Sequence, residues 1–393
     1  MTKFKLNRRQ AIIGLTSSVT AFALSGPAVA ANLAGKKIVM VFLRGGTDGL
    51  GVLAPIADPH YAGHRRQLAM TSAQTLPMGG GFGLNPNMPN VHQMVLNQEA
   101  IFISGIGAPY HNRSHFDGQE GVERGVTNLA DRRDGWLSRA LVQMGVAIEG
   151  IAIGTRVPKM LSGEANILNY APARLPPLDV DTMNRIANLT AADTLIGPPI
   201  TQIVDDTISG RTTLNVPNNA SDFEIAAALL NNQDPQLAGI VMVDMGGWDT
   251  HDNAWPLAGN NARVAQQCAQ LDNNIQALKT GLGTNWANTV VMVVSEFGRN
   301  VAVNGSDGLD HGIGGLAMLA GGAVKGLAGG VRGGFAGLAP GALVDGQDLA
   351  ISTDMRAIFK GVLRDHLGMT LAELNNVVFP NSSTIAPMDN LIL

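Results

Sequence analysis

The chain contains little cysteine, little charge and few aromatic residues. Only one of its 393 residues is cysteine, so no disulfide can form within the chain. Charged residues make up 15% and aromatic residues 5%, whereas apolar residues reach 45%. This combination excludes a disordered chain and a charged coiled coil. The formal net charge of −4 also argues against a nucleic-acid-binding protein.

Long apolar runs are missing as well. A membrane-spanning helix needs about 20 predominantly apolar residues. After residue 30, every apolar run is interrupted by Gly, Asp or Pro before it reaches that length. We therefore expect no membrane span in the mature protein.

Residues 1–30 have the pattern of a targeting signal. A basic start without acidic residues precedes a weakly apolar run at 11–24, and small residues follow at 27–30. The pair Arg8 and Arg9 resembles the twin-arginine signature. The sequence therefore predicts that the twin-arginine translocase exports the folded protein and that the signal is removed. The mature chain is then expected to be periplasmic or secreted.

Short, continuously apolar runs recur along the mature chain, and each ends in Gly, Asp or Ser. They lie at 37–43, 100–104, 150–153, 238–243, 289–294 and 315–319. Continuous rather than alternating hydrophobicity is typical of strands that are buried on both faces. The sequence therefore predicts an α/β fold with a mostly parallel central sheet sandwiched by helices.

Helical patterns lie between and after these runs. Apolar residues recur at helical spacing over 255–282 and over 353–367. We expect Thr353 to cap the second helix and Gly368 to end it. The chain over 31–393 is interpreted as one domain, in which the Pro-rich segment at about 161–219 is an insertion or cap over the sheet.

Polar residues collect directly after the predicted strands, where ligands bind in open parallel sheets. Asp48 follows the first run among glycines, where a carboxylate can reach a metal or a phosphate, or can cap a tight turn. Asp249 and His251 follow the run at 238–243, and mixed oxygen and nitrogen ligands suit a divalent metal. The competing interpretation of this loop is an acidic cap for the helix that follows.

The run at 289–294 leads into a second group of candidates. Glu296 at the strand end is a candidate oxygen ligand, and Arg299 is a candidate clamp for an anion. Asp310 and His311 lie in the loop beyond, with His311 as a further candidate ligand. A surface loop rich in Gly and Asp is the alternative for this second piece.

Ser114 follows the run at 100–104, at the expected start of a short helix. A serine there can simply cap the helix, but its hydroxyl also lies beside free backbone N–H groups and the positive end of the helix dipole. An oxyanion or a covalent phosphoryl-type intermediate would be stabilised at such a position. His111, Arg113 and His115 lie within one turn of it, which is unusual for a plain cap.

Two other kinds of active site are excluded. Residues 49–54 fit the dinucleotide pattern G-x-G-x-x-A, but they begin six residues beyond the strand, and Pro55 disfavours a helix there. A G-x-S-x-G elbow does not occur, which argues against a serine hydrolase of that type.

Five short motifs resemble those of a known family. They are VFLRGGTDG at 41–49, RSHFD at 113–117, GWDTHD at 247–252, SEFGR at 295–299 and DHG at 310–312. In this order they resemble the twin-arginine-exported domain-of-unknown-function 1501 family, over nearly the whole mature chain. That family is similar in fold to the alkaline phosphatase and sulfatase superfamily. The resemblance implies an alkaline-phosphatase-like sheet between helices, with divalent metals at the strand ends.

The resemblance also implies roles for individual residues. Asp48 resembles the first-strand aspartate that ligates a metal, and Ser114 resembles the nucleophile at a helix start. Asp249 and His251 resemble the acid and imidazole ligands of a second metal position, and His311 resembles its late histidine.

Glu296 departs from the pattern that the resemblance implies. The superfamily usually has Asp followed by His at this place, but Phe297 follows Glu296. Asp310 and His311 supply that pair in a second alignment, and both alignments stay open. The sulfatase nucleophile pattern Cys/Ser-x-Pro-x-Arg is missing, and Cys268 lies on the apolar stripe of its helix, where it is better interpreted as core.

The resulting hypothesis is an exported, metal-dependent hydrolase of phosphate or sulfate esters that acts on a small anionic ester. In it, Ser114 or a metal-activated water attacks the ester, His115 or His251 transfers a proton, and Arg299, Arg113 or Arg44 holds the non-bridging oxygens. One or two divalent ions (Zn, Mg, Ca or Mn) would be bound by Asp48, Asp249, His251, Glu296, Asp310 and His311. The alternative is a non-catalytic binding or assembly protein on the same fold, with a degenerate metal site.

Overall fold

The computed structural model describes most of the chain from residue 35 onward. The described residues are 35–111, 113–145, 149–171, 178–208, 216–217, 219–231, 237–254 and 262–393. The predicted signal at 1–30 and the first part of the helix predicted at 255–282 lie outside them. Within the described ranges, none of the helices is both long enough and apolar enough to span a membrane.

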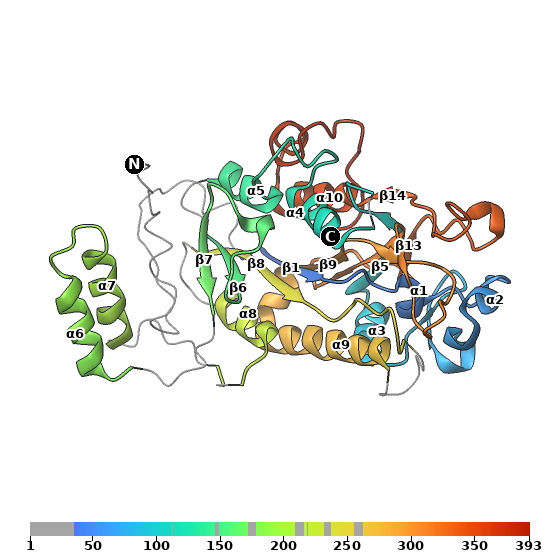
Figure 1. Cartoon of the computed structure of the whole chain (residues 1–393), viewed down its shortest axis with the longest axis horizontal. Helices are drawn as coiled ribbons and strands as arrows, with labels where there is room; N and C mark the ends of the chain where they lie inside the picture. Colours follow the sequence, from blue (N-terminus) through green and yellow to red (C-terminus); the bar gives the residue numbers. More distant parts are fainter. Residues whose placement is uncertain are drawn as a thin grey trace.

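A nine-stranded sheet forms the centre of the molecule (Figure 1). Its strands are β1 (Lys37–Leu43), β5 (Ala100–Gly107), β6 (Glu149–Ile153), β7 (Asn166–Tyr170), β8 (Leu237–Met245), β9 (Thr289–Ser295), β12 (Gly315–Ala320), β13 (Val331–Gly333) and β14 (Thr353–Asp354). The strand order is β13-β5-β12-β9-β1-β8-β6-β7, and β14 pairs with β5. Strand β12 runs antiparallel to β5 and β9, while the other neighbouring strands are parallel. All six predicted runs are strands of this sheet, and the predicted fold class is confirmed.

The central strand β1 shows why its sequence is continuously apolar. Its alternate side chains enter two separate hydrophobic clusters, Val39, Val41 and Leu43 on one face and Ile38, Met40 and Phe42 on the other. Helices cover both faces (Figure 1): α3 (Pro89–Leu96), α8 (Asp222–Leu230) and α9 (Arg263–Leu282) on the first, and α4 (His115–Arg124), α5 (Trp136–Met144) and α10 (Met355–Leu367) on the second. A strand covered on both sides has no face for polar residues.

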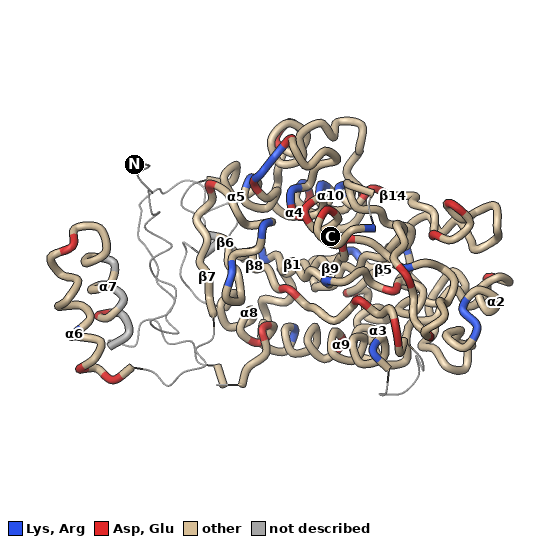
Figure 2. Tube along the Cα trace, in the orientation of Figure 1, with Lys and Arg blue, Asp and Glu red and all other residues tan. Residues whose placement is uncertain are grey.

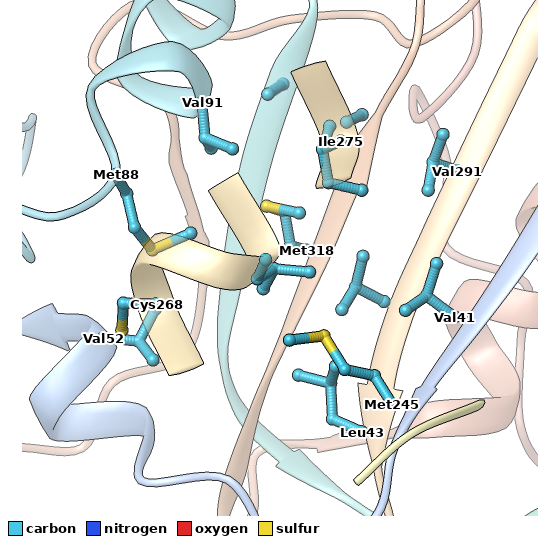
Figure 3. Packing of buried hydrophobic residues seen from close by; sticks show 14 of the residues in the cluster. Val41, Leu43, Val52, Met88, Val91, Met245, Cys268, Ile275, Val291 and Met318 are labelled. Atoms are coloured by element: carbon cyan, nitrogen blue, oxygen red, sulfur yellow. The ribbon is translucent and has the colours of Figure 1, made fainter. Parts of the chain in front are cut away.

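The stripe of α9 packs directly on the sheet (Figure 3). Cys268 and Ile275 of this helix lie among strand residues such as Val41 and Met318, and all four are buried. Complete burial of a side chain such as Val41, Ile275 or Met318 stabilises the fold by about 1.5–3 kcal/mol. Burial also raises the pKa of the Cys268 thiol, so this cysteine is an inert core residue, as the sequence predicts.

The predicted cap of α10 is off by one residue. Thr353 and Asp354 form β14, which pairs with the end of β5, so their backbone belongs to the sheet. Asp354 is the N-cap, and its side chain accepts a hydrogen bond of 2.8 Å from the N–H of Arg356. Gly368 ends the helix in the left-handed conformation, with φ of 77°, as expected.

Part of the predicted insertion at 161–219 belongs to the sheet. Strand β7 is the edge strand and pairs in parallel with β6. After it, α6 (Val180–Thr190) and α7 (Gly197–Ile208) pack against each other and lie apart from the sheet, beyond its β7 edge (Figure 1). Pro172, Pro176 and Pro177 lie outside the described residues.

Short elements complete the fold. They are α1 (Gly49–Val52), α2 (Tyr61–Arg65), α11 (Leu371–Glu373), a small sheet of β2 (Leu53–Ala54), β3 (Leu76–Pro77) and β4 (Gly83–Leu84), and the antiparallel pair of β10 (Gly298–Arg299) and β11 (His311–Gly312). The last pair places Arg299 opposite His311. It thereby brings the loop that carries His311 back to the end of β9.

The charged residues lie mainly on the helices and loops around the sheet, where both signs are interspersed (Figure 2). Strand β9 carries none, and β1 carries only Lys37 at its first position. Charge is therefore confined to the ends of the strands and to the covering layers, and the strand ends are where the candidate site lies.

Candidate metal centre

The loops that follow β1 and β8 touch at the end of the sheet. The N–H of Trp248 donates to the carbonyl of Arg44 at 3.3 Å. Gly45 has a φ of 126°, and a Cβ at this position would clash with the backbone of Asp249. Only glycine allows this approach, because it tolerates positive φ and has no side chain.

Three imidazole rings and one carboxylate meet at this end of the sheet. Ligand atoms of His115, Asp249 and His311 all lie within 4.8 Å of one another. The Nε2 of His251 lies 2.9 Å from the Nε2 of His311 and 3.2 Å from Oδ1 of Asp249. These four residues are called the His/Asp cluster below. They come from the start of α4, the loop after β8 and strand β11.

The other nitrogen of each ring contacts an oxygen. Nδ1 of His115 lies 2.8 Å from Oε1 of Glu296, and Nδ1 of His251 lies 3.3 Å from Oδ1 of Asp310. Nδ1 of His311 lies 2.6 Å from the backbone carbonyl of Arg113. Carbonyl and carboxylate oxygens only accept hydrogen bonds, and for His115 and His311 the Nδ1 contact is much shorter than the contact of Nε2 with Asp249, so the proton of each of these neutral rings is assigned to Nδ1. The Nε2 lone pairs of these two rings then face the cluster, as in histidines that bind metals.

The donor set fits a small divalent ion. Nε2 of His115 is buried without a hydrogen-bond partner, and it lies 3.4 Å from Oδ2 of Asp249. Nε2 of His311 is also 3.4 Å from the Asp249 carboxylate, through Oδ1. A tetrahedral ion with bonds of about 2.0–2.1 Å holds its ligand atoms about 3.3 Å apart. The Nε2 atoms of His251 and His311 lie 2.9 Å apart, and either a proton on one of them or a cation between them accounts for this contact.

The surroundings favour the metal-binding forms of two of these residues. Burial raises the pKa of Asp249, but the hydrogen bond and positive charge of Arg299 outweigh burial, and the net pKa is lowered. Burial lowers the pKa of His311, and the positive charge of Arg299 lowers it further. Asp249 is therefore kept ionised and His311 neutral.

Arg299 organises the site instead of clamping a substrate, which corrects the sequence-based prediction. Its side chain is completely buried. Nε donates to the carbonyl of Gly46, Nη1 to that of Leu309, and Nη2 to the carbonyls of Gly45 and Trp248 and to Oδ1 of Asp249. The three nitrogens of the guanidinium are engaged with three loops, so none of them faces an incoming anion.

Glu296 is also placed differently from the prediction that it binds a metal. Its Oε1 accepts hydrogen bonds from the N–H of Gly45 and the amide of Gln119 and contacts His115, while Oε2 accepts from the hydroxyl of Ser295. Burial raises the pKa of this carboxyl, but the hydrogen bonds from Gln119, His115 and the backbone outweigh burial and lower it. Glu296 is thus an ionised carboxylate that orients the ring of His115.

Asp48 does not join the His/Asp cluster, contrary to the prediction from the sequence. Its carboxylate is ion-paired with Arg65, and both side chains are buried. A Cβ added to Gly51 would clash with the carboxylate, which places it against α1. A buried guanidinium needs a counter-ion, and Arg65 takes Asp48 for that purpose.

Three other predicted residues lie at the cluster. Ser114 is the N-cap of α4, and it stands between Arg113, which contacts His311, and His115. His115 itself, predicted to transfer a proton, has its ring among the ligand atoms. Asp310 is exposed and contacts His251 from the side away from the other rings.

Sequence reasoning missed Arg65 and Gln119. Gln119 had a usable signal, because it follows His115 by four residues and so lies on the same face of a helix. Arg65 had none, since the sequence shows neither its burial nor its partner.

The chain matches one family by sequence. Residues 221–365 match the family described as "Protein of unknown function (DUF1501)". The match confirms the predicted resemblance over this segment, which carries Asp249, His251, Glu296 and His311. The motifs at 41–49 and 113–117 lie outside it. No curated protein is a significant sequence match to the chain.

Several solved structures are similar to the chain at low identity. The PsFucS1 sulfatase from Pseudoalteromonas sp. is 14% identical with a TM-score of 0.42, over 93% of this chain and 76% of the other. An alkaline phosphatase superfamily protein from Vibrio parahaemolyticus is 12% identical with a TM-score of 0.35, over 77% of this chain and 63% of the other. The phosphonate monoester hydrolase of Agrobacterium radiobacter is 12% identical with a TM-score of 0.34, over 85% and 74%.

Proposed function

We propose that this protein is an exported hydrolase of phosphate or sulfate esters that holds one divalent ion at the His/Asp cluster. The observation that carries the proposal is the arrangement of three imidazoles around the carboxylate of Asp249, with an oxygen at each Nδ1. Zinc suits this donor set, because imidazole is a zinc ligand, whereas magnesium and calcium prefer six or more oxygens. Such an ion polarises the ester and lowers the pKa of a nearby hydroxyl or water.

Ser114 is the proposed nucleophile. Its position at the N-cap of α4 puts the N–H groups and positive dipole end of that helix beside the group being transferred. The Ser114 hydroxyl would give up its proton as Oγ bonds to phosphorus or sulfur, while the bond to the alcohol breaks and the alcohol leaves with that proton. Water would then release phosphate or sulfate from the serine.

Arg113 is the proposed contact for the non-bridging oxygens, in place of Arg299. Its side chain is 40% exposed, and its Nε and Nη2 donate to Asp348 at 3.2 and 2.6 Å. Asp348 is fully buried and so fixes the direction of the guanidinium. Arg113 directly precedes Ser114, which places a cation next to the proposed nucleophile.

A non-catalytic metal-binding protein is the second candidate. It is favoured by the internal contacts of Asp48 and Glu296, which leave two predicted ligands outside the His/Asp cluster. One ion position then remains where the resemblance implies one or two.

Elemental analysis and turnover of aryl phosphates and aryl sulfates test the proposal on the full chain. We expect about one bound ion and turnover in the wild type. His311→Ala should lose both, and Ser114→Ala should keep the ion but lose turnover by a factor of at least about 100. The matched control Ser306→Ala changes an exposed loop serine and should alter neither.

The outcomes separate the two candidates. An ion that is bound without turnover supports the binding protein, and a wild type without any ion refutes both. Export is tested separately by replacing Arg8 and Arg9 with Lys, which should retain the precursor in the cytoplasm of a bacterial host.

A further inference from the structure

Helix α4 carries a polar stripe that leads away from the His/Asp cluster. His115, Gln119 and Glu123 recur at intervals of four residues, so they lie on one face of the helix. This face meets the ends of β1, β8 and β9, where Arg44, Asp244 and Glu296 are located. The stripe therefore connects the proposed metal centre to a partly buried group of charges.

Arg44 contacts two carboxylates of this group directly. Its Nη2 donates to Oε1 of Glu123 at 3.1 Å and to Oδ2 of Asp244 at 3.0 Å, and its guanidinium lies over the ring of Phe42, 4.7 Å from the ring centre. Nη1 donates to Oε1 of Gln119 at 2.8 Å. Two carboxylates and one aromatic ring thus hold the guanidinium in one orientation.

Each contact from Arg44 to the cluster has only one possible direction. A guanidinium only donates, so it faces the oxygen of the Gln119 amide and turns the nitrogen away. That nitrogen donates to Oε1 of Glu296 at 3.0 Å. An ionised carboxylate only accepts, so it takes the Nδ1 proton of His115 at 2.8 Å. The position of Arg44 therefore sets the orientation of the Gln119 amide, which contacts Glu296, and Glu296 in turn orients the imidazole of His115.

We propose that Gln119 is a positioning residue of the metal centre, which Arg44 orients so that Glu296 holds the His115 ring with Nε2 toward the ion. The assignment rests on the proposed metal site and adds a residue to it that touches neither ion nor substrate. It predicts that metal affinity depends on a side chain one helical turn away from the ligand.

Gln119→Met is the test variant. Methionine has a similar length and a high helix propensity, but it neither accepts from Arg44 nor donates to Glu296. We expect the zinc dissociation constant, measured by competition with a chromogenic chelator, to rise 10- to 100-fold. The visible spectrum of the Co²⁺-loaded protein should change as well, because the His115 ring is no longer fixed.

Gln93→Met is the matched control. Gln93 is exposed on α3, and its amide contacts Asn97 one turn along the helix. This substitution should leave the zinc constant and the Co²⁺ spectrum unchanged. Thermal unfolding of the metal-free proteins is measured in parallel.

Each outcome decides the assignment. A wild type that binds no Zn²⁺ or Co²⁺ overturns the metal centre and, with it, the role of Gln119. A wild type that binds the ion and a Gln119→Met variant with the same constant and spectrum overturn the role alone. Weaker binding in a variant whose metal-free form also unfolds at a much lower temperature shows general destabilisation and overturns it too.

Discussion

Two groups of polar side chains in this protein differ in what those side chains contact. At the His/Asp cluster, the Nε2 atoms of His251 and His311 face each other at 2.9 Å. In the helical layer formed by α4, α5 and α10, Arg139 of α5 and Lys360 of α10 are buried among oxygen acceptors.

The buried cations are satisfied by the protein itself. Nζ of Lys360 donates to the side chain of Asn375 and to the carbonyls of Ser382 and Ile385 at 2.6–2.9 Å. Burial lowers the pKa of Lys360 to about 8, a shift of the kind found at active sites. Its three protons already have acceptors, so we interpret it as a structural anchor for the C-terminal segment.

The comparison shows that burial and a shifted pKa do not by themselves identify a functional residue. Acceptors that face other acceptors, as in the His/Asp cluster, need a further group between them. Donors that face acceptors, as around Lys360, do not. Three substitutions test this difference, in order of decreasing expected effect.

Arg139→Met should have the largest effect, and it should act on stability alone. The guanidinium donates to the carbonyls of Arg124, Val377 and Val378 and to Asp134. Its loss leaves buried acceptors unpaired, and we expect the free energy of unfolding to fall by about 4 kcal/mol. Chemical denaturation measures this, and bound metal per folded chain should not change.

The control for this variant is Arg185→Met on α6. Arg185 is exposed and pairs with Asp181 on the helix surface, so the change should cost less than about 0.5 kcal/mol. Equal losses in the two variants would contradict the structural role of Arg139.

His366 lies on α10, in the same helical layer as Arg139. His366→Gln should make the free energy of unfolding less sensitive to acid. Burial lowers the pKa of His366 from 6.5 to about 4. Between these values the unfolded chain binds a proton that the folded chain does not, so stability is complete above pH 6.5 and falls as the pH drops toward 4. The contribution is about 3 kcal/mol, from about 1.4 kcal/mol per pKa unit.

Unfolding free energies at pH 7 and pH 4.5 check this prediction. The difference between the two should be smaller in His366→Gln than in the wild type. His60→Gln, which replaces an exposed imidazole, should keep the wild-type difference. A His366→Gln difference as large as that of the wild type would argue against the role assigned to burial.

Asp249→Asn should act mainly on the metal. Asparagine keeps an oxygen for Arg299 but removes the anionic ligand, so we expect the zinc dissociation constant to rise about 100-fold, or about 2.7 kcal/mol. The metal-free variant should also lose unfolding free energy, but less than Arg139→Met, because the buried Arg299 loses a counter-ion while it keeps its acceptors. Asp252→Asn in the same loop is the control. If the zinc dissociation constant rises in Asp252→Asn and not in Asp249→Asn, the His/Asp cluster is not the metal site.

Much of the fold and part of the site were predictable from the sequence. The run at 37–43 is apolar at successive positions because both faces of β1 are covered, and the same reasoning located β5, β6, β8, β9 and β12 but not β7, β13 or β14. Asp249 and His251 were identifiable because the loop after a parallel strand opens at the ligand-binding edge.

Other assignments depended on partners far along the chain. Asp48 looked like a ligand, but it is neutralised by Arg65 on a separate short helix. Arg299 looked like an anion clamp, but backbone carbonyls of three loops occupy its donors. The sequence predicted Thr353 as the cap of α10, but the cap is Asp354, because the backbone of Thr353 pairs with β5 in the sheet.

The sequence alone determined which stretches are strands and which polar side chains come to their ends, because hydrophobic periodicity and chain order are local properties. Only the tertiary structure decided which of those side chains face one another. A carboxylate becomes a metal ligand, a counter-ion or a hydrogen-bond acceptor according to its nearest neighbours, and here those neighbours lie 17 residues away for Asp48 and 181 for Glu296.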